Sequence, residues 1–168
     1  MTDGGSSIPA VRALLRVLAA GRRVAEIGTA FGEGAAAMAE TARDVVTVEI
    51  DPERVEAARA RLAGLANVEL LEGDWHELLP PRAPFDLVFA DGGLRSREDY
   101  WESLLPLVAR GGLIVKDDLM PGRPVDGDPV REALFRHPGL AAVEILTTPD
   151  TAAILATRLS RSSAGAGA

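Results

Sequence analysis

Short apolar runs alternate with segments of helical spacing along most of the chain. The apolar runs predict strands at residues 24–27, 45–51, 68–71, 85–90, 113–116, 143–146 and 153–156. Apolar residues that recur every three or four positions predict helices at 8–18, 34–42, 52–62, 96–109 and 128–135. Strand and helix therefore alternate up to the last two strands, which follow one another directly.

This alternation predicts an α/β fold: a Rossmann-like, seven-stranded and mainly parallel sheet with helices on both faces. The last two strands are too close in sequence for a helical crossover, so we expect them to form an antiparallel hairpin. At 168 residues, the chain is expected to form a single domain over residues 1–158. Residues 159–168 are rich in serine, alanine and glycine and are expected to be a disordered tail.

Residue types at the segment ends predict where helices begin and stop. Ser7 is the expected N-cap of the first helix, and Asp51 is expected to cap the helix over 52–62. Gly111-Gly112 is expected to end the helix over 96–109.

The glycine-rich segment over residues 24–34 is the clearest candidate for a ligand site. An apolar run ends at Glu26 and Gly28, and two further glycines follow before a helix of small residues. Glycines at the carboxyl end of a first strand let the backbone approach a small ligand. About twenty residues later the second predicted strand carries Glu49, which is suited to hold two ribose hydroxyls. Together these features predict a nucleoside-containing cofactor.

Two kinds of nucleoside cofactor fit these residues. Gly32-Glu33-Gly34-Ala35-Ala36-Ala37 matches the dinucleotide pattern G-x-G-x-x-A, which makes NAD an alternative. In that pattern the first glycine follows the strand directly, because the helix N-terminus must meet a pyrophosphate, whereas here the strand ends four residues before Gly32. Written Glu26-x-Gly28-x-x-x-Gly32-x-Gly34, the segment resembles the first motif of class I S-adenosylmethionine-dependent methyltransferases. A structural turn that binds no ligand is the third interpretation.

Acidic residues follow each strand of the predicted parallel sheet. These residues are Glu26, Glu49 with Asp51, Asp74, Asp91, and Asp117 with Asp118. Aspartate also caps helices and nucleates turns, which would explain any one of them. Because the carboxyl ends of parallel strands share one edge of the sheet, the set as a whole predicts a functional site there.

From Ser7 to Arg158 the chain resembles the cation-dependent O-methyltransferases of the catechol and caffeoyl-CoA type. The matching segments are 24–34, Val48-Glu49-Ile50-Asp51, Gly73-Asp74-Trp75, 85–91 and 111–118. The spacing from Asp91 to Asp118 runs without gaps against the family pattern. The resemblance implies the methyltransferase form of the doubly wound sheet.

The resemblance also implies a role for each matched position. The implied S-adenosylmethionine-binding residues are Glu26, Gly28, Thr29, Phe31, Gly32, Gly34, Glu49, Ile50, Asp74, Trp75 and Asp91, with Glu49 at the ribose and Asp74 and Trp75 at the adenine. The implied ligands of Mg²⁺ or another divalent cation are Asp91, Asp117 and Asp118, and the catalytic candidates are Asp91 and Lys116. Such a cation would lower the pKa of a phenolic hydroxyl, and methyl transfer then needs the two reactants held near contact distance.

The sequence departs from the family pattern at three places. Family members carry a lysine that acts as general base three residues after the first metal aspartate, where this chain has Leu94 followed by Arg95, a poor base. Lys116 and His76 are the candidates to replace it, although the context of His76 favours a surface position. Family members usually have Asp-Asn where this chain has Asp117-Asp118, which adds one negative charge. Relatives also carry N-terminal helices over the site, whereas only roughly twenty residues precede the first strand here.

Composition narrows the classes of function. A net charge of −7 argues against a large nucleic-acid footprint, and no apolar run is long enough to span a membrane. The chain has no cysteine for a disulfide or a thiolate site, and the expected location is the cytoplasm.

The leading hypothesis is an S-adenosylmethionine-dependent O-methyltransferase for a small phenolic or catechol-like acceptor, with a homodimer as the suggested assembly. The alternatives are a methyltransferase acting on RNA or another large acceptor, and a module that binds the cofactor without transferring methyl.

Overall fold

The computed structural model describes residues 7–92 and 100–160 of the chain. The strands are β1 (Arg23–Ile27), β2 (Asp44–Glu49), β3 (Val68–Glu72), β4 (Phe85–Ala90), β5 (Val108–Leu119), β6 (Leu140–Leu146) and β7 (Ala152–Arg158). The helices are α1 (Pro9–Ala19), α2 (Glu33–Ala39), α3 (Pro52–Leu62), α4 (Trp75–Leu78), α5 (Tyr100–Leu104) and α6 (Pro129–Phe135), with short 3₁₀ helices η1 (Pro80–Arg82) and η2 (Leu105–Leu107).

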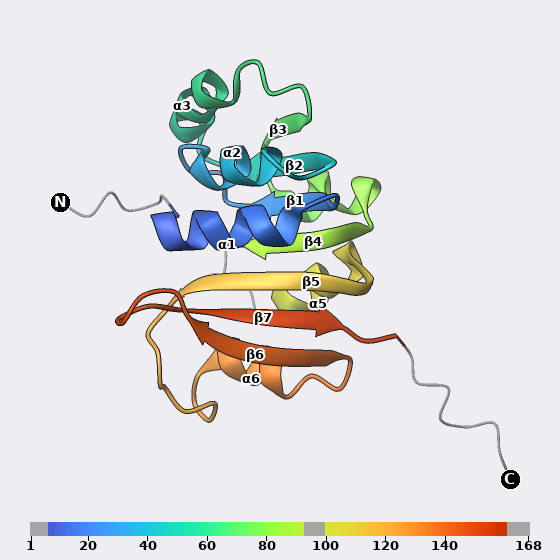
Figure 1. Cartoon of the computed structure of the whole chain (residues 1–168). Coiled ribbons are helices and arrows are strands. Elements are labelled where there is room, and N and C mark those ends of the chain that lie inside the picture. Colours follow the sequence, from blue (N-terminus) through green and yellow to red (C-terminus); the bar gives the residue numbers. More distant parts are fainter. Residues whose placement is uncertain (1–6, 93–99, 161–168) are drawn as a thin grey trace, which may run out of the picture.

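The strands form one sheet in the order β3-β2-β1-β4-β5-β7-β6 (Figure 1). Strands β1 to β5 pair in parallel, whereas β7 runs antiparallel to both β5 and β6. The predicted Rossmann-like α/β fold is thereby confirmed, including its seven strands and its C-terminal hairpin. This order brings the carboxyl ends of β1, β2, β4 and β5 to one edge of the sheet.

Helices cover both faces of the sheet, as predicted. The first face packs against α1, α2 and α3 through a core that includes Leu15, Val24 and Val45. The second face packs against α4, α5 and α6 through a core that includes Ala25 and Val46. Neighbouring strand residues thus enter opposite layers, as the two-residue period of a strand requires.

The predicted N-cap of α1 is wrong. The cap position is Ile8, whose side chain makes no capping hydrogen bond, and Pro9 begins the helix. Proline at this position lacks an N–H that the first turn would leave unpaired, so the helix begins without a polar cap. By contrast, Asp51 caps α3 as predicted and accepts hydrogen bonds from the N–H groups of Glu53 and Arg54.

The predicted end of the helix over 96–109 is also wrong. Within the described residues, α5 ends at Leu104 and η2 follows, because Pro106 cannot continue an α-helix. The chain is already extended at Val108, so Gly111-Gly112 lies inside β5 instead of ending a helix. The register between β4 and β5 shifts across this stretch.

Most of the predicted disordered tail, residues 161–168, lies outside the described residues. Leu159, at its start, donates its N–H to the carbonyl of Gly139 at 2.8 Å, so the chain is still attached to the fold there. Among the described residues, none of the helices has the length and apolar character needed to cross a membrane.

Candidate functional site

The ends of β1 and β4 approach each other closely at two glycines. The N–H groups of Asp91 and Gly92 both donate to the carbonyl of Ile27, at 3.1 and 2.7 Å. Gly28 has a φ of +90°, and a Cβ atom added there would lie 2.9 Å from the Cα of Gly92. Position 28 therefore requires glycine, and the backbone is left bare at the edge of the sheet.

A cavity of about 320 Å³ opens beside this contact, at the ends of β1, β2 and β3. Its wall consists of Ile27, Gly28, Val48, Glu49, Ile50, Arg54, Gly73, Asp74, Trp75, His76 and Gly92. A smaller cavity of about 150 Å³ is lined by Gly28, Ala30, Glu49, Arg54, Asp91, Gly92 and Asp118. Because four wall residues are shared, the two cavities are neighbours. Together they extend from the aromatic pair after β3 to the aspartates after β4 and β5.

Glu49 stands on the wall of both cavities with its carboxylate held by the backbone. Oε2 accepts the N–H of Ala30 at 2.8 Å, and Oε1 accepts those of Ile50 and Asp51 at 3.0 and 3.1 Å. A carboxylate has about four lone-pair sites, so Oε2 keeps one for a ligand hydroxyl. In this arrangement a second ribose hydroxyl would have to compete with a backbone bond at Oε1.

Asp74, Trp75 and His76 form the opposite end of the larger cavity. Asp74 Oδ1 accepts the backbone N–H of His76 at 2.9 Å and lies 2.8 Å from its Nδ1. The rings of Trp75 and His76 stack with centroids 3.7 Å apart. The side chain of His76 is 15 % exposed, and its Nε2 is buried without a hydrogen-bond partner among the described residues. The expected surface position of His76 is therefore wrong, because the stack makes it part of the cavity wall.

Glu26 lies buried behind the glycine loop. Its Oε2 accepts a 2.5 Å hydrogen bond from the hydroxyl of Thr47, which lies 2.5 Å from the hydroxyl of Thr29. Burial raises the pKa of Glu26 well above its ordinary value; the bond from Thr47 opposes this, and the charge of Asp91 adds to it. A Cβ atom on Gly34 would collide with Oε1 of Glu26, so a larger residue at 34 would have to displace this buried carboxylate.

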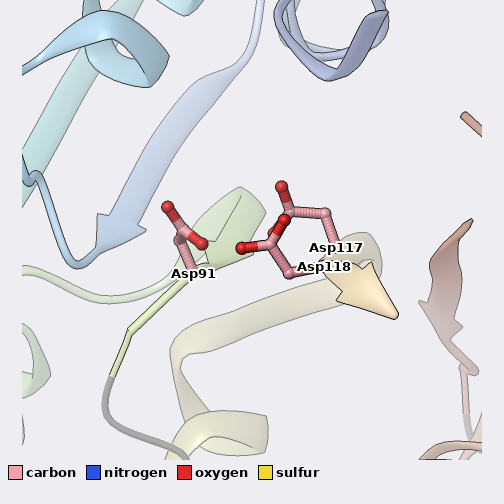
Figure 2. Close-up of side chains that lie close together, drawn as sticks. All are labelled: Asp91, Asp117 and Asp118. Atoms are coloured by element: carbon pink, nitrogen blue, oxygen red, sulfur yellow. The ribbon is translucent and has the colours of Figure 1, made fainter. Parts of the chain in front are cut away.

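Three aspartates gather at the ends of β4 and β5 (Figure 2). One carboxylate oxygen from each of Asp91, Asp117 and Asp118 lies within 4.8 Å of the others. Asp117 is 1 % exposed, and within the described residues neither of its carboxylate oxygens has a hydrogen-bond partner. Burial, followed by the charge of Asp117, raises the pKa of Asp91 to about 8, and burial also raises the pKa of Asp117. A buried carboxylate without a hydrogen-bond donor is unfavourable, so this cluster favours a positive ligand.

The backbone at the end of β5 explains how two consecutive aspartates reach one place. Side chains of successive residues in a regular strand point to opposite faces. Here the pairing of β5 with β7 shifts between Lys116 and Leu119, and Asp118 has a left-handed φ of +57°. This irregularity lets the carboxylates of Asp117 and Asp118 converge.

Lys116 is buried beside these aspartates. Its Nζ donates to the carbonyl of Asp117 at 2.8 Å and lies 3.8 Å from Oδ1 of the same residue. One ammonium group can balance only one carboxylate, so ionisation of all three aspartates would leave negative charge at this edge of the sheet.

The structure divides the predicted site residues into two groups. The residues that line the cavities or belong to the aspartate cluster are Gly28, Glu49, Ile50, Asp74, Trp75, Asp91, Asp117 and Asp118. Those that belong to neither cavity wall nor the aspartate cluster are Glu26 of β1, Thr29, Phe31 and Gly32 of the loop that follows, Gly34 of α2, and Lys116 of β5.

Sequence reasoning missed Gly92 and Arg54 on the walls of both cavities. Gly92 directly follows Asp91 at the end of a strand, which was a usable signal for a close backbone contact. Arg54 lies in the first turn of α3, and no local pattern distinguishes it from a surface arginine. Leu94, at the position of the family's base, lies outside the described residues.

Comparisons with known proteins show the family and the fold. A family model described as a methyltransferase domain matches residues 25–119. A catechol O-methyltransferase of Mycobacterium tuberculosis (strain ATCC 25618 / H37Rv) is 37 % identical over 144 residues, covering 75 % of this chain and 66 % of that protein. A protein-L-isoaspartate O-methyltransferase of Ignicoccus hospitalis is 35 % identical over 121 residues, covering 69 % of this chain and 53 % of that protein. The chain thus spans about half to two thirds of the length of these two relatives.

Solved structures share the same fold. The cofactor-bound crystal structure of Rv0187 from MTB aligns with a TM-score of 0.77 and 31 % identity, covering 92 % of this chain and 83 % of that one. An O-methyltransferase from Bacillus cereus, solved in complex with SAH, aligns with a TM-score of 0.75 over 92 % of this chain and 83 % of that one. Its 22 % identity shows the fold alone.

Two glycines with the same backbone conformation test the contact between β1 and β4. Gly28 and Gly64 have φ values of +90° and +86°, but an added Cβ meets Gly92 at position 28 and nothing within 4 Å at position 64. We expect Gly64→Ala to lower the free energy of unfolding by about 1–2 kcal/mol, the cost of the left-handed backbone. Gly28→Ala should lose about 1–3 kcal/mol more, because the contact must open. Urea denaturation measures both losses, and equal losses would contradict the close approach.

Thermal unfolding across pH tests the burial of Glu26. A carboxyl whose pKa is raised on folding stabilises the folded state least at high pH, and stability falls as pH rises above the unfolded value of about 4.3. Glu26→Gln cannot ionise and keeps an acceptor for Thr47. We therefore expect the melting temperature of the variant, relative to the parent, to rise as the pH increases from this unfolded value towards neutrality. A difference that stays constant over this range would show that Glu26 is not the group responsible.

Proposed function

Because the chain belongs to the methyltransferase domain family, we propose that it transfers a methyl group from S-adenosylmethionine to a hydroxyl oxygen of a small acceptor. The proposed acceptor is a phenol or a catechol-like molecule, and the transfer is assisted by a divalent cation. The catechol O-methyltransferase relative supports this class of acceptor, and the structure solved with SAH supports this cofactor. The homodimer and the cytoplasmic location suggested by the sequence stay predictions.

The buried carboxylate of Asp117 is the observation that carries the cation part of the proposal. Neither of its oxygens has a hydrogen-bond partner among the described residues, and Asp91 and Asp118 add oxygens within 4.8 Å. Mg²⁺ and similar hard cations take oxygen ligands and retain waters, so this donor set fits such an ion. A cation held by these residues would supply Lewis acidity that lowers the pKa of the acceptor hydroxyl.

The two neighbouring cavities fit the parts of the proposed cofactor. Oε2 of Glu49 would accept a ribose hydroxyl, and the stacked rings of Trp75 and His76 would border the adenine. The bare backbone at Gly28 and Gly92 would lie against the methionine part. The cofactor supplies a methyl group on a positively charged sulfonium, and the aspartates beside the smaller cavity favour that charge.

Lys116 offsets part of the negative charge of the aspartate cluster. Its Nζ is engaged with the carbonyl of Asp117 and lies near the carboxylate of the same residue. These contacts support a charge-balancing role for Lys116, and its predicted role as base stays a prediction. His76 lines the larger cavity, whereas Asp91 and Asp118 line the smaller one, so its position supports cofactor binding.

Ligand-induced stabilisation tests the cofactor. We expect S-adenosylhomocysteine at 100 times its dissociation constant to add about 2.7 kcal/mol and to raise the melting temperature by about 5–10 °C. NAD⁺ at the same concentration should produce no shift, since Gly32, the first glycine of the dinucleotide pattern, does not follow β1 directly. A shift with NAD⁺ and none with S-adenosylhomocysteine would contradict the proposal.

Asp117→Asn tests the cation, because it keeps the side-chain volume and removes the buried charge. Changes to residues outside the metal ligands cost roughly tenfold in activity. Because Asp117 is a proposed ligand, we expect its replacement to lower the rate of Mg²⁺-dependent methyl transfer to catechol by more than this. Asp126→Asn is the matched control, because Asp126 carries the same charge on a side chain that is 82 % exposed. Transfer that survives both Asp117→Asn and a chelator would contradict the cation mechanism. Transfer to tRNA but not to any of a panel of phenols would favour a large acceptor instead.

A further inference from the structure

The end of β5 holds an unfavourable backbone conformation beside the proposed cation site. Asp118 has a φ of +57°, and its strand loses register with β7 between Lys116 and Leu119. A non-glycine residue in the left-handed region persists only where its surroundings fix it. The contacts just after Asp118 therefore decide whether the two aspartates stay together.

Arg131 of α6 makes such a contact. Its side chain is 1 % exposed, and one guanidinium nitrogen donates to the carbonyl of Met120 at 2.7 Å. The other two nitrogens donate to Asp128 at 2.7 Å and to Glu144 at 2.8 Å. All three guanidinium nitrogens are thus engaged, and the buried charge is balanced by two carboxylates.

The carboxylates that hold Arg131 are themselves fixed by the fold. Asp128 caps α6 and accepts the backbone N–H of Arg131 at 3.2 Å. Glu144 of β6 also accepts the N–H of Gly122, at 3.3 Å. The chain that leaves β5 is therefore tied at Met120 and Gly122 to α6 and to the edge strand of the sheet.

We propose that Arg131 is a positioning residue for the cation site: by holding the carbonyl of Met120, it keeps Asp117 and Asp118 converged on Asp91. This inference rests on the proposed function, because it concerns the affinity of the same aspartates for a cation. Arg131 itself lines neither of the two cavities. A purely structural role would lower stability without changing cation affinity.

Arg131→Lys tests this role, since lysine keeps the charge but cannot reach three partners. The probe is Mn²⁺ alone, titrated calorimetrically into the full chain at a temperature well below the unfolding transition. We expect the dissociation constant for Mn²⁺ to rise by about tenfold or more, as for other residues that orient metal ligands. Glu144→Gln, a milder change in the same network, should shift it in the same direction by less.

Arg158→Lys is the matched control at the other end of β5. Arg158 also donates to backbone carbonyls, those of Leu105 and Val108, at 3.1 and 2.6 Å. We expect this variant to lose stability in urea and to bind Mn²⁺ as the parent does. Unchanged Mn²⁺ affinity in folded Arg131→Lys, or equal weakening in both variants, would overturn the inference.

Hydrogen exchange without any cation separates this inference from the proposed function. In Arg131→Lys the amides of residues 117–120 and of Gly122 should exchange at least about tenfold faster, while those of 113–115 are unaffected. Failure of the parent chain to bind Mn²⁺ would contradict the proposed cation site alone. Unchanged exchange over 117–122 would overturn the positioning role whatever the parent binds.

Discussion

Negative charge buried at one edge of the sheet is the constraint on which this structure depends. Three backbone N–H donors stabilise the carboxylate of Glu49. Glu26 accepts a hydrogen bond from Thr47, and burial raises its pKa. Asp117 has the ammonium group of Lys116 at 3.8 Å and, among the described residues, no hydrogen-bond partner. Along this edge, the carboxylates of Glu49 and Glu26 thus have hydrogen-bond donors, whereas that of Asp117 is unsatisfied among the described residues. The unsatisfied one belongs to the cluster whose other members border the smaller cavity, which is why that end of the site favours a positive ligand.

Much of this arrangement could be predicted from the sequence because it follows from topology. Buried parallel strands read as apolar runs, so the strands were located from local pattern alone. Parallel strands with helical connections place their carboxyl ends together, so the sequence alone groups Asp91 with Asp117 and Asp118. The glycine loop is predictable as a place where the backbone can approach a ligand, and the structure adds that the backbone of Gly92 lies against Gly28.

The features that could not be predicted from the sequence depend on contacts between residues distant in sequence or on irregular backbone. Arg131 reaches partners 3, 11 and 13 positions away, and nothing in its helix distinguishes it from an exposed arginine. His76 is partly buried with its ring stacked on Trp75, whereas its sequence context suggested a surface position. The register shift at the end of β5 left no signature in the alternation of residue types. Pro106 is a different case, because the signal that ends α5 was present in the sequence and was outweighed by the helical spacing around it.

The family that the chain resembles usually has Asp-Asn where this chain has Asp117-Asp118. The left-handed backbone of Asp118 is relevant to this difference. Asparagine and aspartate are the non-glycine residues that adopt this conformation most readily, and both offer an oxygen to a cation. Either residue therefore meets the backbone constraint, and the two differ mainly in charge. Asp118 is exposed whereas Asp117 is buried, so water screens the additional charge at 118. The carboxylate that needs a cation or a proton is the buried one, and that need is the same with either residue at 118.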